Sequence, residues 1–282
     1  NAVARRLSSH HTGTLGVVFS LGRSFHIELV EHLYAASDDF ELVLSAMTPG
    51  RSERVALDAL LDQRPEAVLL IGGSLPGDAL SRAARATPVV VALREVRDRR
   101  VDSVRTDEAA GIRAAMEHLT GLGHQHVAHV DGGTAPGARA RRRAYLSCLA
   151  DDSGAAEPRV VPGGTTEQDG RRSATALLHE GLGATTALTV FNDRAALGVI
   201  DHLQRAGTQV PEGVSVAGFD DIRASAYAHV GLTTVRQDGA ELARRLVAAA
   251  RRRLGDPTAA PTRDVIAPQL VVRSTTAPPA AG

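Results

Sequence analysis

Two pairs of adjacent polar residues stand where apolar runs end, and their side chains are well placed for chemistry. The run "VSVAGFDDI" stops at Asp220 and Asp221, and "TALTVFND" stops at Asn192 and Asp193. In open parallel α/β sheets, ligands bind outside the carboxyl ends of strands. Adjacent residues of a strand point to opposite faces, so Asp220 and Asp221 cannot act as a glycosidase pair. One acid of the pair can accept hydrogen bonds from a ligand while the other caps the following helix.

The same two roles are open to Asn192 and Asp193. Capping alone explains each pair about as well as ligand binding does. Their convergence at the carboxyl edge of one sheet, however, favours a pocket. Asn192 offers both a donor and an acceptor, which suits a neutral, hydroxyl-rich ligand.

An arginine run, "RARRRAY", extends from Arg139 to Tyr145. It is explained either by a solvated basic helix face or by phosphate binding. In a helix, Arg139 shares a face with Arg142 or Arg143, while Arg141 is turned away. One arginine can therefore point into a cleft while the others stay in water, and the spacing alone does not choose which.

Several kinds of chemistry are excluded by residue type. The chain has no lysine, which removes Schiff-base catalysis and the P-loop lysine, and the single Cys148 removes an internal disulfide and a cysteine-based zinc site. The loops "IGGSLPG" and "DGGTAPG" do not match a dinucleotide-binding spacing. His124 and His126 share a strand face and could hold a metal, but polar residues at a strand entrance explain them better. We therefore expect no catalytic residue, no metal and no cofactor.

Length and composition are typical of a two-domain α/β protein. The 282 residues are 43% hydrophobic, 23% charged and 3% aromatic, and the net charge of +0 gives no global attraction to nucleic acid. No window approaches the ~18 apolar residues of a membrane span, and the first residues lack the apolar segment of a secretory signal. We expect no membrane partner and a cytoplasmic location.

Short apolar runs alternate with helix-period segments, which predicts parallel sheets built from βαβ units. The first helix is expected to bury Ile27, Val30, Leu33 and Tyr34 on one face. About a dozen strands are too many for one strongly twisted open sheet. We therefore expect two similar α/β lobes that divide near residues 119–123. The expected strands are "TLGVVF", "ELVLSA", "EAVLLIGG", "PVVVAL", "HVAHVDGG", "TALTVFND", "GVSVAGFDD", "LTTVRQD", "RDVIAP" and "QLVVRST".

Several blocks in a fixed order resemble the LacI-type family of bacterial transcriptional repressors, from Asn1 to about Thr276. "NAVARRL" followed by "TGTLGVV" resembles the family's hinge helix and first strand, and "DEAAGIRAAMEHLTGLGHQHVAHVDG" resembles its central segment. "FNDRAALGVIDHLQRAGTQVPEGVSVAGFDDI" is the strongest block, and "LTTVRQ" with "LVVRST" completes the order.

The resemblance implies an α/β fold of the periplasmic-binding-protein-like type, with two parallel-sheet α/β lobes, three crossovers and a ligand cleft. Residues 1–13 would be a hinge segment. Residues 14–119 and 237–266 would form the N-terminal lobe, and residues 122–234 and 268–276 the C-terminal lobe. We expect residues 277–282 to be a disordered tail.

The resemblance also implies which residues contact the ligand. By motif position the ligand arginine is Arg141, the asparagine Asn192 and the aspartate Asp220, while Asp221 keeps a structural role. The full expected ligand-contacting set is Arg141, Asn192, Asp220, Phe19, Phe25 and Arg94.

Two positions depart from the family pattern. The family's Asn-Pro-Phe-Phe-like turn after the first strand reads "GRSFHIE", so Phe25 and His26 occupy the Phe-Phe positions. The family's Asp-Arg after the fourth strand reads Leu93-Arg94.

The resemblance implies that DNA is contacted outside the two lobes. The family's helix-turn-helix would precede Asn1 and is expected to be missing from this chain. Residues 1–9 are too few for a stable isolated helix, so the hinge would fold only on DNA. There Leu7, beside Ala4, would wedge into the minor groove.

The leading hypothesis is the effector-binding and dimerising domain of a DNA-binding repressor that senses a small polar metabolite, with a sugar expected. The alternative is an exported sugar-binding protein of a transporter, which shares the fold. The hinge-like "NAVARRL" favours the repressor. An enzyme on a doubly wound sheet ranks last, because the chain has no nucleophile elbow, dinucleotide loop or lysine.

Overall fold

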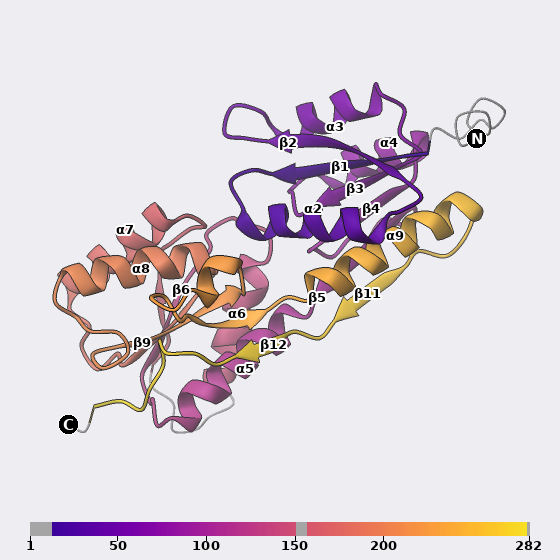
Figure 1. The fold of residues 1–282 in the computed structure, drawn as a ribbon. Coiled ribbons are helices and arrows are strands. Elements are labelled where there is room, and N and C mark those ends of the chain that lie inside the picture. Colours follow the sequence, from indigo (N-terminus) through magenta and orange to yellow (C-terminus); the bar gives the residue numbers. More distant parts are fainter. Residues whose placement is uncertain (1–12, 151–156, 281–282) are drawn as a thin grey trace. The chain divides into compact units, whose positions relative to one another are not determined.

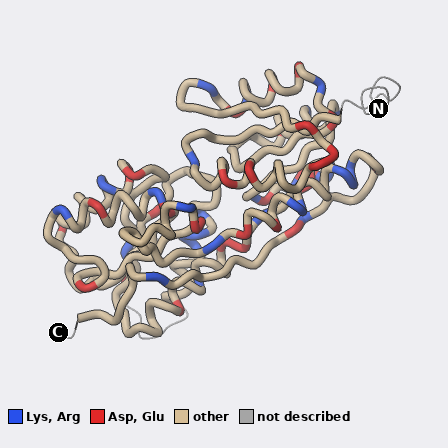
Figure 2. The backbone as a smooth tube through the Cα atoms, viewed as in Figure 1, with Lys and Arg blue, Asp and Glu red and all other residues tan. Residues whose placement is uncertain are grey.

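The computed structural model describes residues 13–150 and 157–280 (Figure 1). The expected hinge residues Ala4 and Leu7 lie outside the described residues. Among the described helices, none combines the length and the apolar character needed to cross a bilayer. Acidic and basic positions are interspersed along the backbone (Figure 2).

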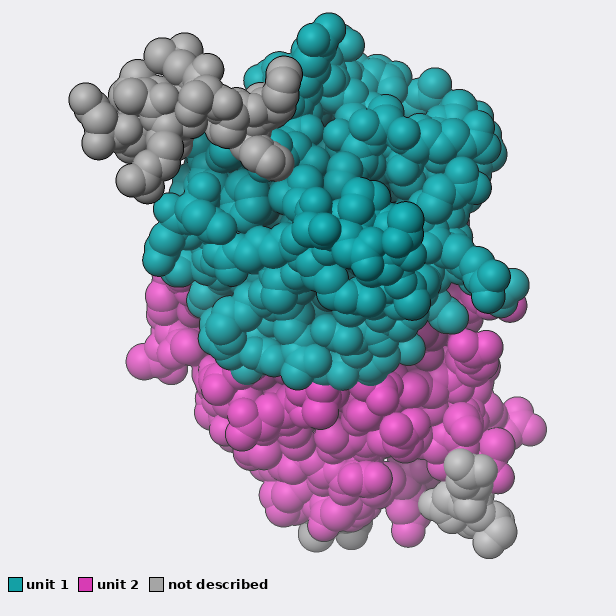
Figure 3. Space-filling view, turned by 90° about the vertical axis from the view of Figure 1, so that its right-hand side faces the viewer, with its two compact units in different colours: residues 1–106, 238–266 teal, residues 107–237, 267–282 magenta. Residues whose placement is uncertain are grey.

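The chain forms two compact units, coloured separately in Figure 3. Unit 1 comprises residues 1–106 and 238–266, and unit 2 comprises residues 107–237 and 267–282, so the chain passes between them three times. The expected division near residues 119–123 is wrong, because α5 (Glu108–Gly121) belongs to unit 2. Its Gly111 lies so close to Phe219 and Val235 that even an added methyl group would crowd both side chains.

Unit 1 contains one six-stranded parallel sheet. Its strands are β1 (Thr14–Ser20), β2 (Glu41–Met47), β3 (Ala67–Ile71), β4 (Val89–Ala92), β5 (Val101–Thr106) and β11 (Arg263–Ile266). Their order is β11-β5-β4-β3-β1-β2, and every neighbouring pair is parallel. Strands β3 and β4 are buried at every position, as expected for parallel strands covered on both faces.

Helices cover both faces of this sheet (Figure 1). They are α2 (Ser24–Ala36), α3 (Glu53–Leu61), α4 (Gly77–Ala86) and α9 (Gly239–Gly255). Helices α3 and α4 share one core with β1, β3 and β4, in which Leu57, Leu60, Leu80 and Val18 are buried. Helix α9 packs against α2 and against β3, β4 and β5.

Unit 2 is built on a second six-stranded sheet. Its strands are β6 (Val127–Val130), β7 (Arg159–Val161), β8 (Ala187–Val190), β9 (Ser215–Asp220), β10 (Thr233–Arg236) and β12 (Gln269–Val271). The order is β12-β10-β9-β8-β6-β7. Only β12 is antiparallel to its neighbour among these described strands.

Two helix pairs enclose the second sheet. Helices α7 (Glu167–Glu180) and α8 (Asp193–Arg205) pack on one core, and α5 with α6 (Ala138–Ala150) packs on the other. Where α7 and α8 cross, a methyl group at Gly170 would overlap the Ala195 carbonyl, and one at Gly198 would overlap the Glu167 carbonyl. Glycine at both positions lets the two backbones touch. A short 3₁₀ helix, η1 (Arg223–Ala226), follows β9.

Two expectations for local structure are wrong in unit 1. Helix α2 buries Val30 and Leu33 as expected, together with Leu29, but the expected burial of Ile27 and Tyr34 is wrong, because they are 39% and 54% exposed. Strand β5 was not expected, because Asp102 interrupts its apolar pattern. Asp102 is buried since it accepts two bonds from Arg253, at 2.9 Å from Nε and 3.0 Å from Nη2.

The segment expected to be a disordered tail is packed on unit 2 as far as it is described. The Ala277 N–H donates to Ser215 Oγ at 3.0 Å, and its carbonyl accepts from the Ser215 hydroxyl. The ring of His124 lies 2.9 Å from the same carbonyl oxygen. The expectation of a disordered segment is therefore wrong at Ala277, which is hydrogen-bonded to unit 2.

Candidate functional site

Polar side chains gather where four neighbouring strands of unit 2 end. Asp131 follows β6, Asn192 follows β8, Asp220 ends β9, and Gln237 follows β10, and these strands are consecutive in the sheet order β10-β9-β8-β6. Arg141 extends from α6 to Phe191 and Glu108 beside these strand ends. We call Asp131, Arg141, Asn192, Asp220 and Gln237 the polar edge. The structure thus brings together the three unit 2 residues expected from the sequence.

Arg141 is held rigidly and is only 4% exposed. Its Nε donates to Glu108 Oε2 at 2.5 Å, and its Nη1 donates to the Phe191 carbonyl. The guanidinium carbon lies 3.5 Å from the ring centroid of Phe219 and 4.7 Å from that of Phe191. Such stacking attracts a cation to the aromatic faces. The remaining Nη2 lies 3.8 Å from Asp220 Oδ1.

Asp220 and Asp221 have different hydrogen-bond partners, and both residues have positive φ. The φ values are 119° and 56°, a conformation rare outside glycine. Asp220 Oδ1 accepts from Gln237 Nε2 at 2.7 Å. Asp221 instead accepts from Arg236 Nε and Arg273 Nη2, both at 2.6 Å, and so holds β10 and the end of the chain together.

Asn192 is the N-cap of α8 and also part of the polar edge. Its Oδ1 accepts from the Ala195 N–H at 3.0 Å, and its Nδ2 donates to the Thr165 carbonyl at 3.1 Å. These bonds fix the rotamer and use one of the two Nδ2 hydrogens. Capping and ligand binding are therefore compatible in this side chain.

Asp193 is a buried acid beneath the same edge, with 0% exposure. It accepts from Thr234 Oγ1 at 2.5 Å, Ser225 Oγ at 2.7 Å and the Ile222 N–H at 3.0 Å. Burial, with the nearby charge of Asp220, raises the pKa of Asp193 to about 8. Through these bonds it ties α8 to η1 and β10, the two elements that follow Asp220 in the chain.

The other three expected ligand-contacting residues lie in unit 1. Phe19, near the end of β1, is 7% exposed, and Phe25, in the first turn of α2, is 6% exposed. Arg94 donates from Nη1 and Nη2 to the Leu75 carbonyl, both at 3.3 Å. Its Nε has no hydrogen-bond partner within the described residues, and burial lowers the pKa of its guanidinium.

His26, at a position that departs from the family pattern, belongs to the wall of β1 and β3. Its Nδ1 accepts from the Ser20 N–H at 3.3 Å, and its Cε1 would lie only 2.7 Å from a Cβ at Gly72. Burial, helped by the Arg23 charge, lowers the pKa of His26 to about 3. The imidazole is therefore neutral at physiological pH.

The alternative of a metal at His124 and His126 finds no support in the geometry. His124 is buried, with Nδ1 2.8 Å from Thr186 Oγ1 and Nε2 3.1 Å from Ser215 Oγ. His126 is exposed. No cluster of three metal-ligating side chains occurs in the part of the chain that the structure describes.

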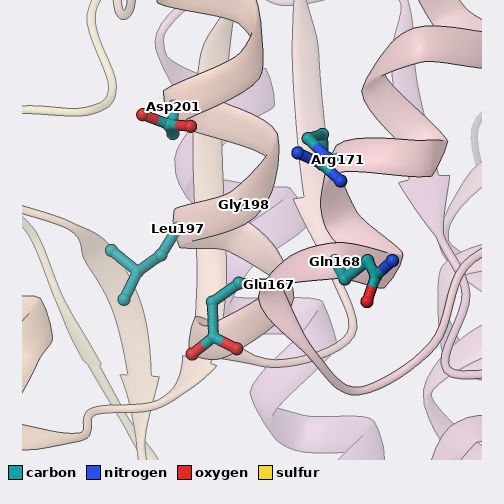
Figure 4. Close-up of a pocket in the computed structure, with 6 residues that line it drawn as sticks. All are labelled: Glu167, Gln168, Arg171, Leu197, Gly198 and Asp201. Carbon is teal, nitrogen blue, oxygen red and sulfur yellow. The ribbon is translucent and has the colours of Figure 1, made fainter.

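A groove on the surface of α7 and α8 is separate from the polar edge (Figure 4). Its acids are already paired: Glu167 with Arg194 and Asp201 with Arg205. The groove is lined by Glu167, Gln168, Arg171, Leu197, Gly198 and Asp201.

Three residues of the site were missed in the sequence. Asp131 follows the largely apolar β6, so the rule that identified Asn192 and Asp220 would also have identified it, whereas Gln237 follows the polar sequence "TTVR" of β10 and has no such signal. Asp131 is held by Arg142 Nη1 and the Gly132 N–H, both at 2.8 Å. Glu108 carries no such signal, because an acid in the first turn of a helix is ordinary.

Comparison with known proteins gives this geometry a context. The family model of the periplasmic binding protein-like domain matches residues 116–276. The HTH-type transcriptional regulator AscG of Escherichia coli (strain K12) is 30% identical over 88% of this chain and 76% of its own length. A LacI transcriptional regulator from a Rhodococcus species is 41% identical, with a TM-score of 0.90 over 94% of this chain and 98% of that one. The CelR–cellobiose complex, of a transcriptional regulator, is 25% identical, with a TM-score of 0.83 over 97% and 89%.

Proposed function

The chain belongs to the LacI family of transcriptional regulators, and from this membership we propose that the polar edge of its ligand-binding domain holds a small neutral effector, a sugar. The observation that carries the proposal is the placement of Arg141, Asn192 and Asp220 at one edge of unit 2. The relatives named above are regulators of transcription, which favours this function over that of an exported binding protein.

The chemistry of the polar edge suits hydroxyl groups. Arg141 Nη2 and Asn192 Nδ2 donate, whereas Asp220 accepts, so a sugar hydroxyl can donate to the carboxylate and accept from the guanidinium. Phe191 and Phe219 keep the arginine in place before a ligand arrives. A regulator of similar fold and 25% identity binds cellobiose, which supports a sugar as the effector class.

Phe19, Phe25 and Arg94 are proposed as the ligand contacts that unit 1 supplies. Arg94 is the strongest of the three, since its buried Nε is left without a partner by the described residues. A ligand oxygen would satisfy this donor, and a buried donor without a partner is otherwise costly.

Regulation of transcription requires DNA, and we assign DNA binding to a helix-turn-helix ahead of Asn1 together with the hinge residues Ala4 and Leu7. The relative AscG is itself an HTH-type regulator. A protein acting on operator DNA works in the cytoplasm, which we propose as its location. No catalytic step is assigned to any residue.

We further propose that the chain acts as a homodimer, because a two-fold dimer matches a palindromic operator. Apolar side chains exposed on α2 and β2 support this: Ile27 is 39%, Tyr34 54% and Leu44 41% exposed. Sedimentation at micromolar concentration should show a dimer. A monomer that persists in full-length protein bound to operator would contradict the proposal.

A panel of neutral sugars, measured by thermal shift and then by calorimetry, tests the effector proposal. Losing one buried polar partner costs about 1–3 kcal/mol, so Asp220→Ala and Asn192→Ala should each weaken sugar binding about tenfold or more. Asp201→Ala, on the exposed face of α8, is the matched control and should leave the affinity unchanged. Unchanged affinity in both site variants, with the fold intact, would refute the assignment.

A further inference from the structure

We propose that Glu108 sets the charge preference of the polar edge: by neutralising Arg141 it excludes anionic effectors and restricts the site to uncharged, hydroxylated ones. This proposal rests on the proposed function and restricts the class of effector to uncharged molecules. A buried arginine beside a ligand is ordinarily a receptor for phosphate or carboxylate, because its fork of donors matches two anionic oxygens. The arrangement around Arg141 removes that capacity.

Glu108 accepts the hydrogen bond from Arg141 Nε, the donor that Arg141 would otherwise need to bind an anion with two hydrogen bonds. The Arg141 Nε donates to Glu108 Oε2 at 2.5 Å, and the two side chains are only 5% and 11% exposed. Gly137 makes room for this pair: a Cβ there would lie 3.1 Å from Glu108 Oε1 and 3.7 Å from Arg141 Nε. With Nη1 on the Phe191 carbonyl, the guanidinium has only Nη2 directed toward Asp220.

The acids within 4 Å of the Arg141 guanidinium outnumber it two to one. Asp220 Oδ1 lies 3.8 Å from Nη2 and its side chain is 13% exposed, so two carboxylates face one guanidinium. The neighbouring arginines contact other acids and not the ligand side of Arg141: Arg142 pairs with Asp131, while Arg236 and Arg273 share Asp221 and so keep one positive charge beyond its carboxylate.

An anion brought to this edge therefore meets repulsion from Glu108 and Asp220 that the arginine does not offset. Repulsion is strong in a site shielded from water, where the effective dielectric constant is low. A hydroxyl group meets no such penalty, because it donates to a carboxylate as readily as it accepts from Nη2. Glu108 is in this sense a specificity-determining residue, acting through Arg141.

The decisive experiment measures inorganic phosphate binding by calorimetry and by thermal shift at constant ionic strength, with chloride as the reference anion. Wild type should show no Arg141-dependent phosphate binding. Glu108→Gln keeps the shape and an acceptor for Nε but removes one negative charge, so it should bind phosphate at least tenfold more tightly. The double variant Glu108→Gln with Arg141→Gln should lose that gain. Glu117→Gln, on the exposed face of the same helix, should behave as wild type.

Two outcomes overturn the proposal: a folded Glu108→Gln variant with no gain in phosphate affinity, or wild-type phosphate binding that Arg141→Gln abolishes. Asp220→Asn provides a second route if Glu108→Gln does not fold, since it removes a charge without breaking the Arg141–Glu108 pair, and it too should gain phosphate affinity. The sugar panel separates the two proposals. Sugar binding without a phosphate gain would refute the role of Glu108 alone, whereas a phosphate gain without sugar binding would refute the sugar effector alone.

Discussion

The buried acid Asp193 should make the stability of unit 2 depend on pH in an unusual direction. Its pKa in the folded chain is about 8 against an ordinary 3.8, because burial disfavours its charged form and Asp220 adds like charge. Between these two values the folded state binds a proton that the unfolded state releases. The free energy of unfolding should therefore fall as pH rises from about 4 to about 8, and level off above that.

The magnitude follows from the size of the shift. Each unit of pKa difference corresponds to about 1.4 kcal/mol, so a shift of about four units gives roughly 6 kcal/mol across the whole window. The three donors on the carboxyl group, from Thr234, Ser225 and Ile222, favour the charged form, and the pKa of about 8 already includes their effect. We therefore expect a slope that approaches about 1.4 kcal/mol per pH unit between pH 5 and 7 and flattens near pH 8.

The assay compares wild type with Asp193→Asn by urea unfolding at pH 5, 6, 7, 8 and 9. Asparagine resembles the protonated acid in shape but does not titrate, so the difference between the two proteins isolates this one group. Asp193→Asn should unfold with a lower free energy of unfolding than wild type at pH 5. At pH 9 the two proteins should be equally stable, or the variant should be the more stable one. Asp220→Asn should shift the window to lower pH, since it removes the neighbouring charge. Parallel pH profiles for wild type and Asp193→Asn would show that Asp193 is ionised throughout, and would refute the reasoning.

Three further predictions concern helix packing, a buried ion pair and the hinge. Gly170→Ala should destabilise unit 2 by about 1–3 kcal/mol in urea unfolding, because its methyl group would overlap the Ala195 carbonyl, whereas Gly121→Ala, with open space around it, should not. Arg253→Met should cost about 3–5 kcal/mol by leaving Asp102 charged and buried, and adding Asp102→Leu should recover part of the loss; equal stability of the single variant and wild type would contradict this. In the full-length protein, Leu7→Ala should weaken operator binding in fluorescence anisotropy and leave effector affinity unchanged in calorimetry; unchanged operator affinity would show that the hinge assignment is wrong.

The architecture was predictable from the sequence because buried parallel strands have a local signature. Strands β3, β4, β6 and β8 are apolar over most of their length and buried at every position, so each reads as a short hydrophobic run. Strand β5 lacks that signature. Its Asp102 is stabilised by Arg253, 151 residues away along the chain, and no local pattern reveals such a partner.

Helix α2 shows that apolar spacing alone does not determine which face of a helix is buried. Ile27 and Tyr34 fit one apolar helical stripe with Val30 and Leu33, but the helix buries Val30 and Leu33 together with Phe25, His26 and Leu29. A histidine counts against a buried face when only residue type is considered. His26 is buried nevertheless, because the Ser20 N–H donates to its Nδ1 and Gly72 leaves space for its ring. The choice between two possible faces was thus made by contacts with other strands.

Some residues at the polar edge were predictable from local sequence rules, whereas Glu108, the partner of Arg141, was not. Asn192 and Asp220 could be found because polar residues at the carboxyl ends of parallel strands lie at one edge, and that rule depends only on the backbone. Glu108 could not be found, since its sequence context explains it fully as an acid near a helix N-terminus. Only the packing of α5 beside α6 gives it Arg141 as a partner. On our proposal, the strand ends therefore determine where a ligand binds, and a contact between two helices determines which charge that ligand can carry.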